Sequence, residues 1–174
     1  MAILSHFSLD RKLRVLVDAI PKSCRVLEIG CGAGEVRKYM LSHGWRDYTG
    51  LDLRPPADIV GDIRDWQRLG LHPESFDAII AFEVVEHVDC WQAMYDLLKP
   101  DGVLMVTTPI PSRDWICRLL ERAGLAQKRT SPHDHLVDLR RVPKFELHSL
   151  ERVGWLAQWG IFHKPFPGGG EEGQ

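Results

Sequence analysis

The chain has 174 residues, of which 44% are hydrophobic and 26% are charged, and its formal net charge is −2. This composition is typical of one soluble globular domain, so we expect a single domain over residues 1–166 and a flexible, glycine-rich tail over 167–174. No apolar run approaches the roughly 20 residues that cross a membrane, and a near-neutral chain does not bind nucleic acid by bulk charge. The four cysteines form no CxxC pair, which favours reduced thiols in a cytoplasmic protein.

Apolar spacing and turn residues predict alternating helices and strands along the chain. The first half is expected to contain, in order, a helix over 9–20, a strand over 24–29, a helix over 35–43, strands over 48–53 and 57–60, and a helical turn over 65–69. The second half is expected to contain a strand over 76–82, a helix over 91–98, a strand over 103–108, helices over 114–123 and 145–153, and a strand over 155–163.

This alternation predicts an α/β fold, a Rossmann-like parallel sheet with helices on both faces. The fold is pared down, because only about five residues separate Asp52 from the next strand, too few for a crossover helix. Ligands of such sheets bind beyond the carboxyl ends of the strands. The site is therefore expected near residues 30–34, 52–54, 61–63, 82–87 and 107–113.

A glycine-rich loop follows the first expected strand and precedes a helix. Gly30, Gly32 and Gly34 allow a tight turn and a close approach of a ligand to the backbone. Asp52 ends the next strand, 22 residues after Gly30, which is the separation at which a carboxylate reaches ribose hydroxyls. Glu28 lies two residues before the loop, where a carboxylate suits a ligand with an amino group better than a pyrophosphate. Together these features predict a nucleoside ligand that carries an amine.

The segment VLEIGCGAGE resembles the first motif of the class I methyltransferases that use S-adenosylmethionine. LDL (51–53), GDI (61–63), FDAIIAFEVVEHV (76–88) and LLKPDGVLMVTTP (97–109) resemble further motifs of that family, in order and at suitable spacing. The resemblance implies the class I methyltransferase fold and S-adenosylmethionine as the cofactor. Family members usually carry a seventh, antiparallel strand, which the sequence does not place.

The resemblance also implies roles for individual residues in holding the cofactor. Glu28 would bind the amino group, Asp52 the ribose hydroxyls and Asp62 the adenine amino group. Asp62 has an alternative role as the N-cap of the helical turn that follows it. The residues implied to bind the cofactor are Glu28, Gly30, Cys31, Gly32, Gly34, Asp52, Leu53, Asp62, Ile63, Phe82 and Glu83.

An ExxEH cluster follows the fourth strand, beside the position of the transferred methyl group. If the chain turns helical there, Glu83, Glu86 and His87 share one face and can form an open metal site. The cluster resembles those of two metal-using branches, the ubiquinone-pathway O-methyltransferases and the small-RNA 2′-O-methyltransferases. The Asp-His context of the RNA branch makes His135 the candidate fourth ligand, with His133 in reserve.

Three interpretations of this cluster stay open: a divalent metal site, metal-free acid–base or binding chemistry by Glu86, His87 and His135, and a structural role. We expect an S-adenosylmethionine-dependent methyltransferase that O-methylates a small molecule or another hydroxyl-bearing acceptor. The alternatives are an RNA 2′-O-methyltransferase, an N- or C-methyltransferase, and a cofactor-binding regulatory subunit without activity.

The acceptor side of the site is expected in the C-terminal third of the chain. Residues 111–152 carry a net charge of +3 against −4 for residues 1–110, and an RNA acceptor is therefore weakly supported. Trp115 is the aromatic residue best placed by the sequence to line an acceptor pocket. Only about 22 residues precede the first strand, little material for a lid, so a second copy of the chain in a homodimer would supply the cover.

Overall fold

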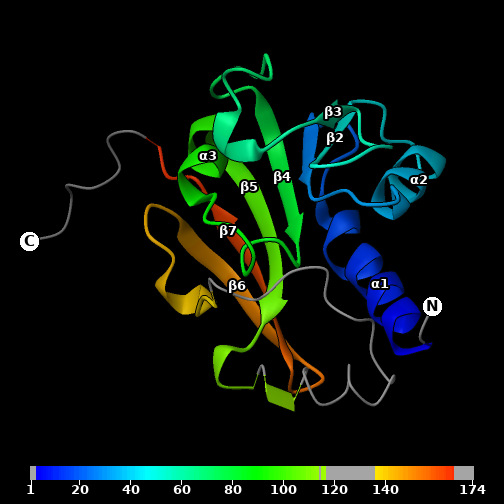
Figure 1. Cartoon of the computed structure of the whole chain (residues 1–174), viewed down its shortest axis with the longest axis vertical. Helices are drawn as coiled ribbons and strands as arrows, with labels where there is room; N and C mark the ends of the chain where they lie inside the picture. The colour runs from blue at the N-terminus through cyan, green and yellow to red at the C-terminus, as the bar shows by residue number, and fades with distance from the viewer. Residues whose placement is uncertain (1–2, 114, 117–135, 167–174) are drawn as a thin grey trace, which may run out of the picture.

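The computed structural model describes residues 3–113, 115–116 and 136–166 of the chain. Its centre is a seven-stranded sheet in the order β3-β2-β1-β4-β5-β7-β6 (Figure 1). The first five strands are parallel, and β7 runs antiparallel to both of its neighbours. The strands are β1 (Val26–Ile29), β2 (Tyr48–Asp52), β3 (Ile59–Val60), β4 (Phe76–Phe82), β5 (Leu98–Pro109), β6 (Glu146–Val153) and β7 (Ala157–His163).

Helices cover both faces of the sheet, as the sequence predicts. The α-helices are α1 (Ile3–Val15), α2 (Glu35–Ser42) and α3 (Trp91–Leu97), and the 3₁₀ turns are η1 (Val17–Ala19), η2 (Ile63–Asp65), η3 (Pro111–Arg113) and η4 (Leu139–Arg141). Figure 1 shows α1 and α2 on one side of the sheet and α3 on the other. Within the described residues, no helix is long and apolar enough to cross a membrane.

Two apolar cores form because the central strands are buried on both faces. Leu16 and Val17 pack with Met40 of α2 against Ile80 and Met105 on one face. On the other face, α3 packs against alternate residues of the same strands; this core includes Met94, Leu97, Ile79, Leu104 and Phe162. The alternation of Ile79 and Ile80 between the cores fixes the register of β4, whose bounds the sequence predicts correctly.

The helix expected over residues 145–153 is wrong, because Glu146–Val153 forms the edge strand β6. Its leucines are spaced as on a helix, but a bulge lies between Leu147 and Ser149. Leu147 pairs with Phe162 and Leu150 pairs with Gly160, so residues three apart on β6 face residues two apart on β7. The bulge thus reproduces a helical spacing within a strand. With β6 in place the sheet has seven strands, and the antiparallel one is β7, which lies within the strand expected over 155–163.

Several other expected bounds shift by a few residues. The first helix begins at Ile3 and passes into η1 after Val15, whereas we expected residues 9–20. β5 begins at Leu98 rather than Val103. The β2–β3 connection contains no helix, in agreement with its short length. The helix expected over 114–123 and the tail over 167–174 lie almost entirely outside the described residues.

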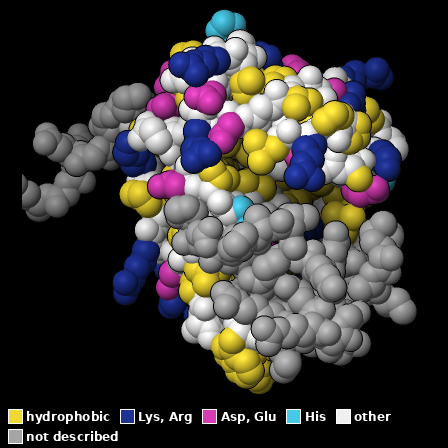
Figure 2. Space-filling view, in the orientation of Figure 1, with side chains coloured by type: hydrophobic (Ala, Val, Ile, Leu, Met, Phe, Trp, Pro, Cys, Tyr) yellow, Lys and Arg dark blue, Asp and Glu magenta, His cyan; other side chains and the backbone are white. Residues whose placement is uncertain are grey.

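The described surface carries charges of both signs. Figure 2 shows Lys and Arg side chains beside Asp and Glu side chains over the upper part of this face. Most ion pairs between described residues are exposed, such as Arg14 with Asp10 on α1, whose side chains are 71% and 58% exposed. Exposed pairs of this kind contribute little to stability. The surface charge therefore gives little support to the fold, which depends on the two cores.

Candidate cofactor and active site

The loop after β1 is shaped by glycine and lies against the end of β4. Gly30 has a φ of 74°, in the left-handed region that favours glycine. A Cβ added to Gly30 would lie 2.5 Å from Cγ2 of Val84. The loop leads through Gly34 into α2, whose first N–H groups point back toward a ligand. Any molecule held by this loop therefore lies beside residues 82–84.

Glu28 is a buried carboxyl group beneath the loop. It is 4% exposed and accepts a hydrogen bond from the hydroxyl of Tyr48 on β2. Burial raises the pKa of Glu28 to about 7, with a further increase from the charge of Asp52 and an opposing decrease from the Tyr48 hydrogen bond. Burial and Glu28 also raise the pKa of Tyr48, so its hydroxyl keeps its proton. A cationic amino group beside Glu28 would compensate the cost of ionising it.

Asp52 ties the end of β2 to the glycine loop. Its Oδ2 accepts a hydrogen bond from Gly32 N at 2.9 Å, and its Oδ1 accepts one from Arg54 N at 3.2 Å. Leu53 follows it with 68% of its surface exposed, and Val60 at the end of β3 is 49% exposed. These two apolar side chains at the edge of the sheet are suited to the flat face of an adenine ring.

Two of the residues implied to bind the cofactor have buried side chains. Ile63 is 3% exposed and belongs to the core under η2, so its side chain does not face the sheet edge. Cys31 is 8% exposed, and burial together with nearby carboxylates raises the pKa of its thiol to about 11. The Cys31 backbone N–H donates to Leu51 O at 3.2 Å. Both residues therefore shape the site from behind.

Asp62 occupies the N-cap position of η2, the alternative that the sequence leaves open. Its Oδ1 accepts from Arg64 N at 2.9 Å, and its Oδ2 lies 2.6 Å from Arg64 Nη2. The hydrogen bonds from the Arg64 side chain lower the pKa of Asp62. A contact of Asp62 with adenine would have to share or replace the Arg64 pairing.

Glu83 is the most constrained residue at the end of β4. Its φ is 57°, a left-handed conformation that is costly for a non-glycine residue, and its N–H donates to Thr107 O at 2.8 Å. Its Oε1 accepts from Lys12 Nζ at 2.6 Å and from Thr107 Oγ1 at 2.9 Å. The Lys12 ammonium also lies 5.6 Å from the centre of the Phe82 ring.

The Glu83 carboxyl group is held in its charged form. Burial acts to raise its pKa, but the Lys12 charge and the hydrogen bonds from Lys12 and Thr107 outweigh burial and lower it. Its side chain is 41% exposed, whereas that of Lys12 is 10% exposed. The carboxylate therefore faces the open edge, and the ammonium lies behind it.

Glu86 is completely buried beside Glu83. Its Oε2 accepts from Thr108 Oγ1 at 3.0 Å, while its Oε1 accepts no N–H or O–H hydrogen bond. Burial raises the pKa of Glu86 to about 8, and the charge of Glu83 adds to the increase. Of the two coupled carboxyl groups, Glu83 is therefore favoured as the anion and Glu86 as the protonated acid.

The residues of the ExxEH cluster are only partly brought together. Residues 83–88 form one hydrogen-bonded turn, in which His87 N donates to Val84 O at 2.9 Å, rather than a helix. Within the described ranges, no three His, Cys, Asp or Glu side chains form a group that could hold a metal ion. His133 and His135 lie outside these ranges. Lys12 already pairs with Glu83, and Glu86 is completely buried with the Thr108 hydroxyl as its donor, so this part of the donor set does not fit a divalent cation.

Lys12 and Tyr48 were not predicted as site residues, and Thr107 and Thr108 were predicted only as part of the range 107–113. Tyr48 and the threonines hold carboxyl groups of the site through hydroxyl donors, which no motif spacing reveals. Lys12 lies in the N-terminal helix, 71 residues from its partner Glu83 in sequence. The one local indication that Lys12 is buried is its position beside Leu13 and Leu16 on the apolar face of a helix, where a lysine side chain has little access to solvent.

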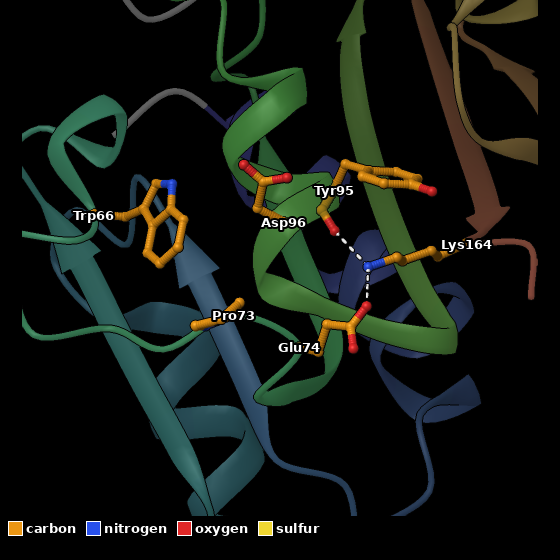
Figure 3. A pocket seen from close by; sticks show the side chains of 6 residues that line it. All are labelled: Trp66, Pro73, Glu74, Tyr95, Asp96 and Lys164. Carbon is orange, nitrogen blue, oxygen red and sulfur yellow. Dashed lines mark hydrogen bonds and ion pairs between the residues drawn. The ribbon is translucent and has the colours of Figure 1, made fainter. Parts of the chain in front are cut away.

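A shallow cavity lies at the amino ends of β4 and β5, whereas the loop and the ExxEH turn lie at the carboxyl ends of the parallel strands (Figure 3). Lys164 is 4% exposed there and donates to Glu74 Oε1 at 3.0 Å, Tyr95 O at 2.9 Å and Leu98 O at 2.8 Å. All three ammonium donors are thereby used. The lysine fastens the end of β7 to the last turn of α3, which is a structural role.

A family model described as "Methyltransferase domain" matches residues 4–162. The ubiquinone biosynthesis O-methyltransferase of Cereibacter sphaeroides (strain ATCC 17025) is 30% identical over 157 residues, which cover 75% of this chain and 62% of that protein. The enzyme of the same name from Actinobacillus pleuropneumoniae serotype 7 is 32% identical over 106 residues, covering 48% of this chain and 45% of that protein. The chain thus spans about half to three-fifths of the length of these relatives.

One further sequence relative has a different reaction in its name, and one solved structure shows the shared fold. The S-adenosyl-L-methionine-dependent Diels-Alderase iccD of Talaromyces variabilis is 29% identical over 125 residues, covering 56% of this chain and 42% of that protein. The crystal structure of the PH0226 protein from Pyrococcus horikoshii OT3 aligns with a TM-score of 0.66 at 17% identity, covering 91% of both chains. The matched family model covers nearly the whole chain, so the protein belongs to the methyltransferase-domain family and has the class I methyltransferase fold.

Proposed function

We propose that the protein transfers a methyl group from S-adenosylmethionine to a hydroxyl group of a small molecule. The observation that carries this proposal is that three features lie together at the carboxyl ends of the parallel strands. These are the glycine loop, the buried Glu28 beneath it, and the Glu83–Glu86 pair directly beside it. The O-methyltransferase names of the sequence relatives support the choice of a hydroxyl acceptor.

The residues of the loop and of β2 fit the donor. The α2 end of the loop offers backbone N–H groups, and Glu28 accepts the amino group, whose positive charge favours the ionised carboxylate. Asp52 exchanges its hydrogen bond to Gly32 N for the ribose hydroxyls. Leu53 and Val60 supply the exposed apolar contact for the adenine ring. Cys31 and Ile63 support the loop and η2 from within the protein.

Bound S-adenosylmethionine supplies an electrophilic methyl group: the acceptor oxygen forms a bond to carbon, the carbon–sulfur bond breaks, and sulfur keeps the electron pair. The chain must align the acceptor and receive the proton of its hydroxyl. We assign proton transfer to His87 and His135 and hydrogen bonding of the acceptor to Glu86, which carries a proton at neutral pH. Glu83 is fixed as an anion at the same edge.

A divalent metal at Glu83, Glu86, His87 and His135 is the other chemistry that the sequence suggests. The pairing of Glu83 with Lys12 disfavours it, because the ammonium already neutralises the carboxylate. We therefore expect methyl transfer to survive treatment with a chelator. Loss of turnover in chelator, restored by one added divalent metal and accompanied by that metal in the purified protein, would overturn this choice.

On the described part of the face in Figure 2, a small acceptor is better supported than RNA. The face in Figure 2 mixes basic and acidic side chains, whereas RNA binding depends on a continuous basic surface. Trp115 follows β5 and is 65% exposed, and Trp155 in the β6–β7 turn is 78% exposed. Ile110 N donates to Leu156 O at 2.8 Å, which joins the two segments at the acceptor side. Exposed tryptophans there suit an apolar or aromatic acceptor.

A second candidate function is use of the bound cofactor without methyl transfer. The relative named as an S-adenosyl-L-methionine-dependent Diels-Alderase favours it, because a protein of the same fold carries a different reaction in its name. The two functions differ in whether the cofactor is consumed.

Calorimetric titration with S-adenosylmethionine and S-adenosylhomocysteine, followed by turnover on a panel of phenols and other hydroxyl compounds, tests the proposal. We expect both ligands to bind and one acceptor class to yield S-adenosylhomocysteine. If neither ligand binds, the proposal fails at the donor site. Binding without product on any acceptor, together with conversion of a substrate at constant S-adenosylmethionine, would favour the second candidate. Salt-dependent turnover on RNA would replace the small acceptor.

A further inference from the structure

We propose that the Lys12–Glu83 ion pair sets the charge balance at the sulfur of the cofactor, and so determines the preference between the donor and the spent product. This inference rests on the proposed function, because it concerns the same cofactor. S-adenosylmethionine carries a positive sulfonium, whereas S-adenosylhomocysteine carries a neutral thioether. A fixed charge near the sulfur therefore changes the affinity for one ligand and leaves the other almost unaffected.

Glu83 lies close to the glycine loop. Glu83 follows β4 directly, and its neighbour Val84 lies against Gly30 of the loop, where a Cβ would approach within 2.5 Å. β1 and β4 are adjacent and parallel, with Ile29 paired to Ala81. A ligand whose amino acid part is held by the loop thus places its sulfur near the Glu83 carboxylate.

The two charges of the ion pair differ in exposure. Lys12 Nζ lies 2.6 Å from Glu83 Oε1, with the carboxylate side chain 41% exposed and the ammonium side chain 10% exposed. Thr107 Oγ1 holds the same oxygen at 2.9 Å. The negative end of the pair thus faces the ligand, and the positive end shields it from behind. The left-handed φ of Glu83 is kept by the same partners, which indicates that this arrangement is worth its conformational cost.

Removing either charge alone changes the preference between the two ligands. Without the Lys12 ammonium, the exposed carboxylate is unshielded and attracts the sulfonium, so the product is disfavoured relative to the donor. Without the Glu83 charge, the ammonium is unpaired and repels the sulfonium, so the product is favoured. Removing both charges restores a neutral surrounding. With both charges present, the site therefore favours neither S-adenosylmethionine nor S-adenosylhomocysteine strongly over the other.

The test is calorimetric titration of both ligands, at low salt and constant pH, with the full-length chain and with K12M, E83Q and the K12M/E83Q double variant. The quantity compared is the ratio of the Kd of S-adenosylmethionine to that of S-adenosylhomocysteine. We expect K12M to lower this ratio and E83Q to raise it, each by about fivefold or more. The double variant should return to within about twofold of the wild type.

Arg14 and Asp10 provide a matched control on the same helix. The R14M variant removes one positive charge from an exposed ion pair of the same helix, as K12M does from the pair with Glu83. The ratio of the two Kd values should therefore stay unchanged in R14M. If K12M does not fold, E83Q and the double variant still give different predictions, because E83Q raises the ratio and the double variant leaves it near the wild-type value. The inference is overturned if both ligands bind the wild type but the two single variants shift the ratio in the same direction or not at all. Failure of the wild type to bind either ligand would instead refute the proposed function.

Discussion

Glu28→Gln is predicted to stabilise the protein at alkaline pH while weakening binding of the cofactor. The buried carboxyl group has a pKa raised from its ordinary 4.5 to about 7. Between these values the folded state binds more protons than the unfolded state, so stability falls as the pH rises through this window. At 1.36 kcal/mol per unit of pKa, a difference of about 2.5 corresponds to about 3 kcal/mol of lost stability above pH 7.

The glutamine has no charge to bury and still accepts the hydrogen bond of the Tyr48 hydroxyl. The free energy of unfolding of Glu28→Gln should therefore match that of the wild type near pH 4.5 and exceed it by about 3 kcal/mol near pH 8. Urea unfolding at both values measures this difference, and Glu35→Gln, an exposed residue of α2, is the control with no change. A difference that does not depend on pH would refute the reasoning, as would tighter S-adenosylmethionine binding by the variant.

Three further predictions test other parts of the structure. Gly30→Ala should destabilise the protein by about 1–3 kcal/mol and abolish cofactor binding, because the new Cβ would meet Val84. Gly70→Ala, at a φ of 75° and with no described atom within 4 Å of the new Cβ, should lose only the stability that a left-handed backbone costs an alanine. Equal losses of stability in thermal melts of the two variants would exclude the contact with Val84. Lys164→Met leaves a carboxylate and two carbonyl oxygens without their donor, and urea titration should show a loss of about 2–4 kcal/mol; wild-type stability would contradict the fastening role. Glu86→Gln should equal the wild type in stability at acid pH and surpass it above pH 8, because burial raises the pKa of Glu86 to about 8; the reverse order would show that Glu86 is ionised in the folded protein.

Much of the fold was predictable because local patterns and tertiary packing agree. The strand over Phe76–Phe82 is a continuous apolar run between turn residues, and its bounds are confirmed. The edge strand β6 was not, since its bulge gives Leu147 and Leu150 the spacing of a helix. Only pairing with β7, a long-range contact, reveals the register.

The residues of the candidate site likewise include some that the sequence predicts and some that it does not. Gly30, Glu28 and Asp52 lie in one βαβ unit with a motif of fixed spacing, so sequence reasoning brings them together. Lys12 reaches Glu83 across 71 residues, and no local pattern connects them. For Ile63 the motif implies a contact with adenine, which stays a prediction, and the structure adds that its side chain belongs to the core beneath η2. A motif fixes the path of the backbone more firmly than it fixes the direction of each side chain.

The central claim is that the loop edge binds S-adenosylmethionine through the Asp52 carboxylate and the glycine loop. Calorimetric titration of the wild type and of Asp52→Ala with S-adenosylmethionine tests it most directly. We predict saturable one-to-one binding by the wild type and a loss of about tenfold or more in the variant, because the ribose hydroxyls lose a charged acceptor. No binding by the wild type, or equal affinity in Asp52→Ala, would contradict the account.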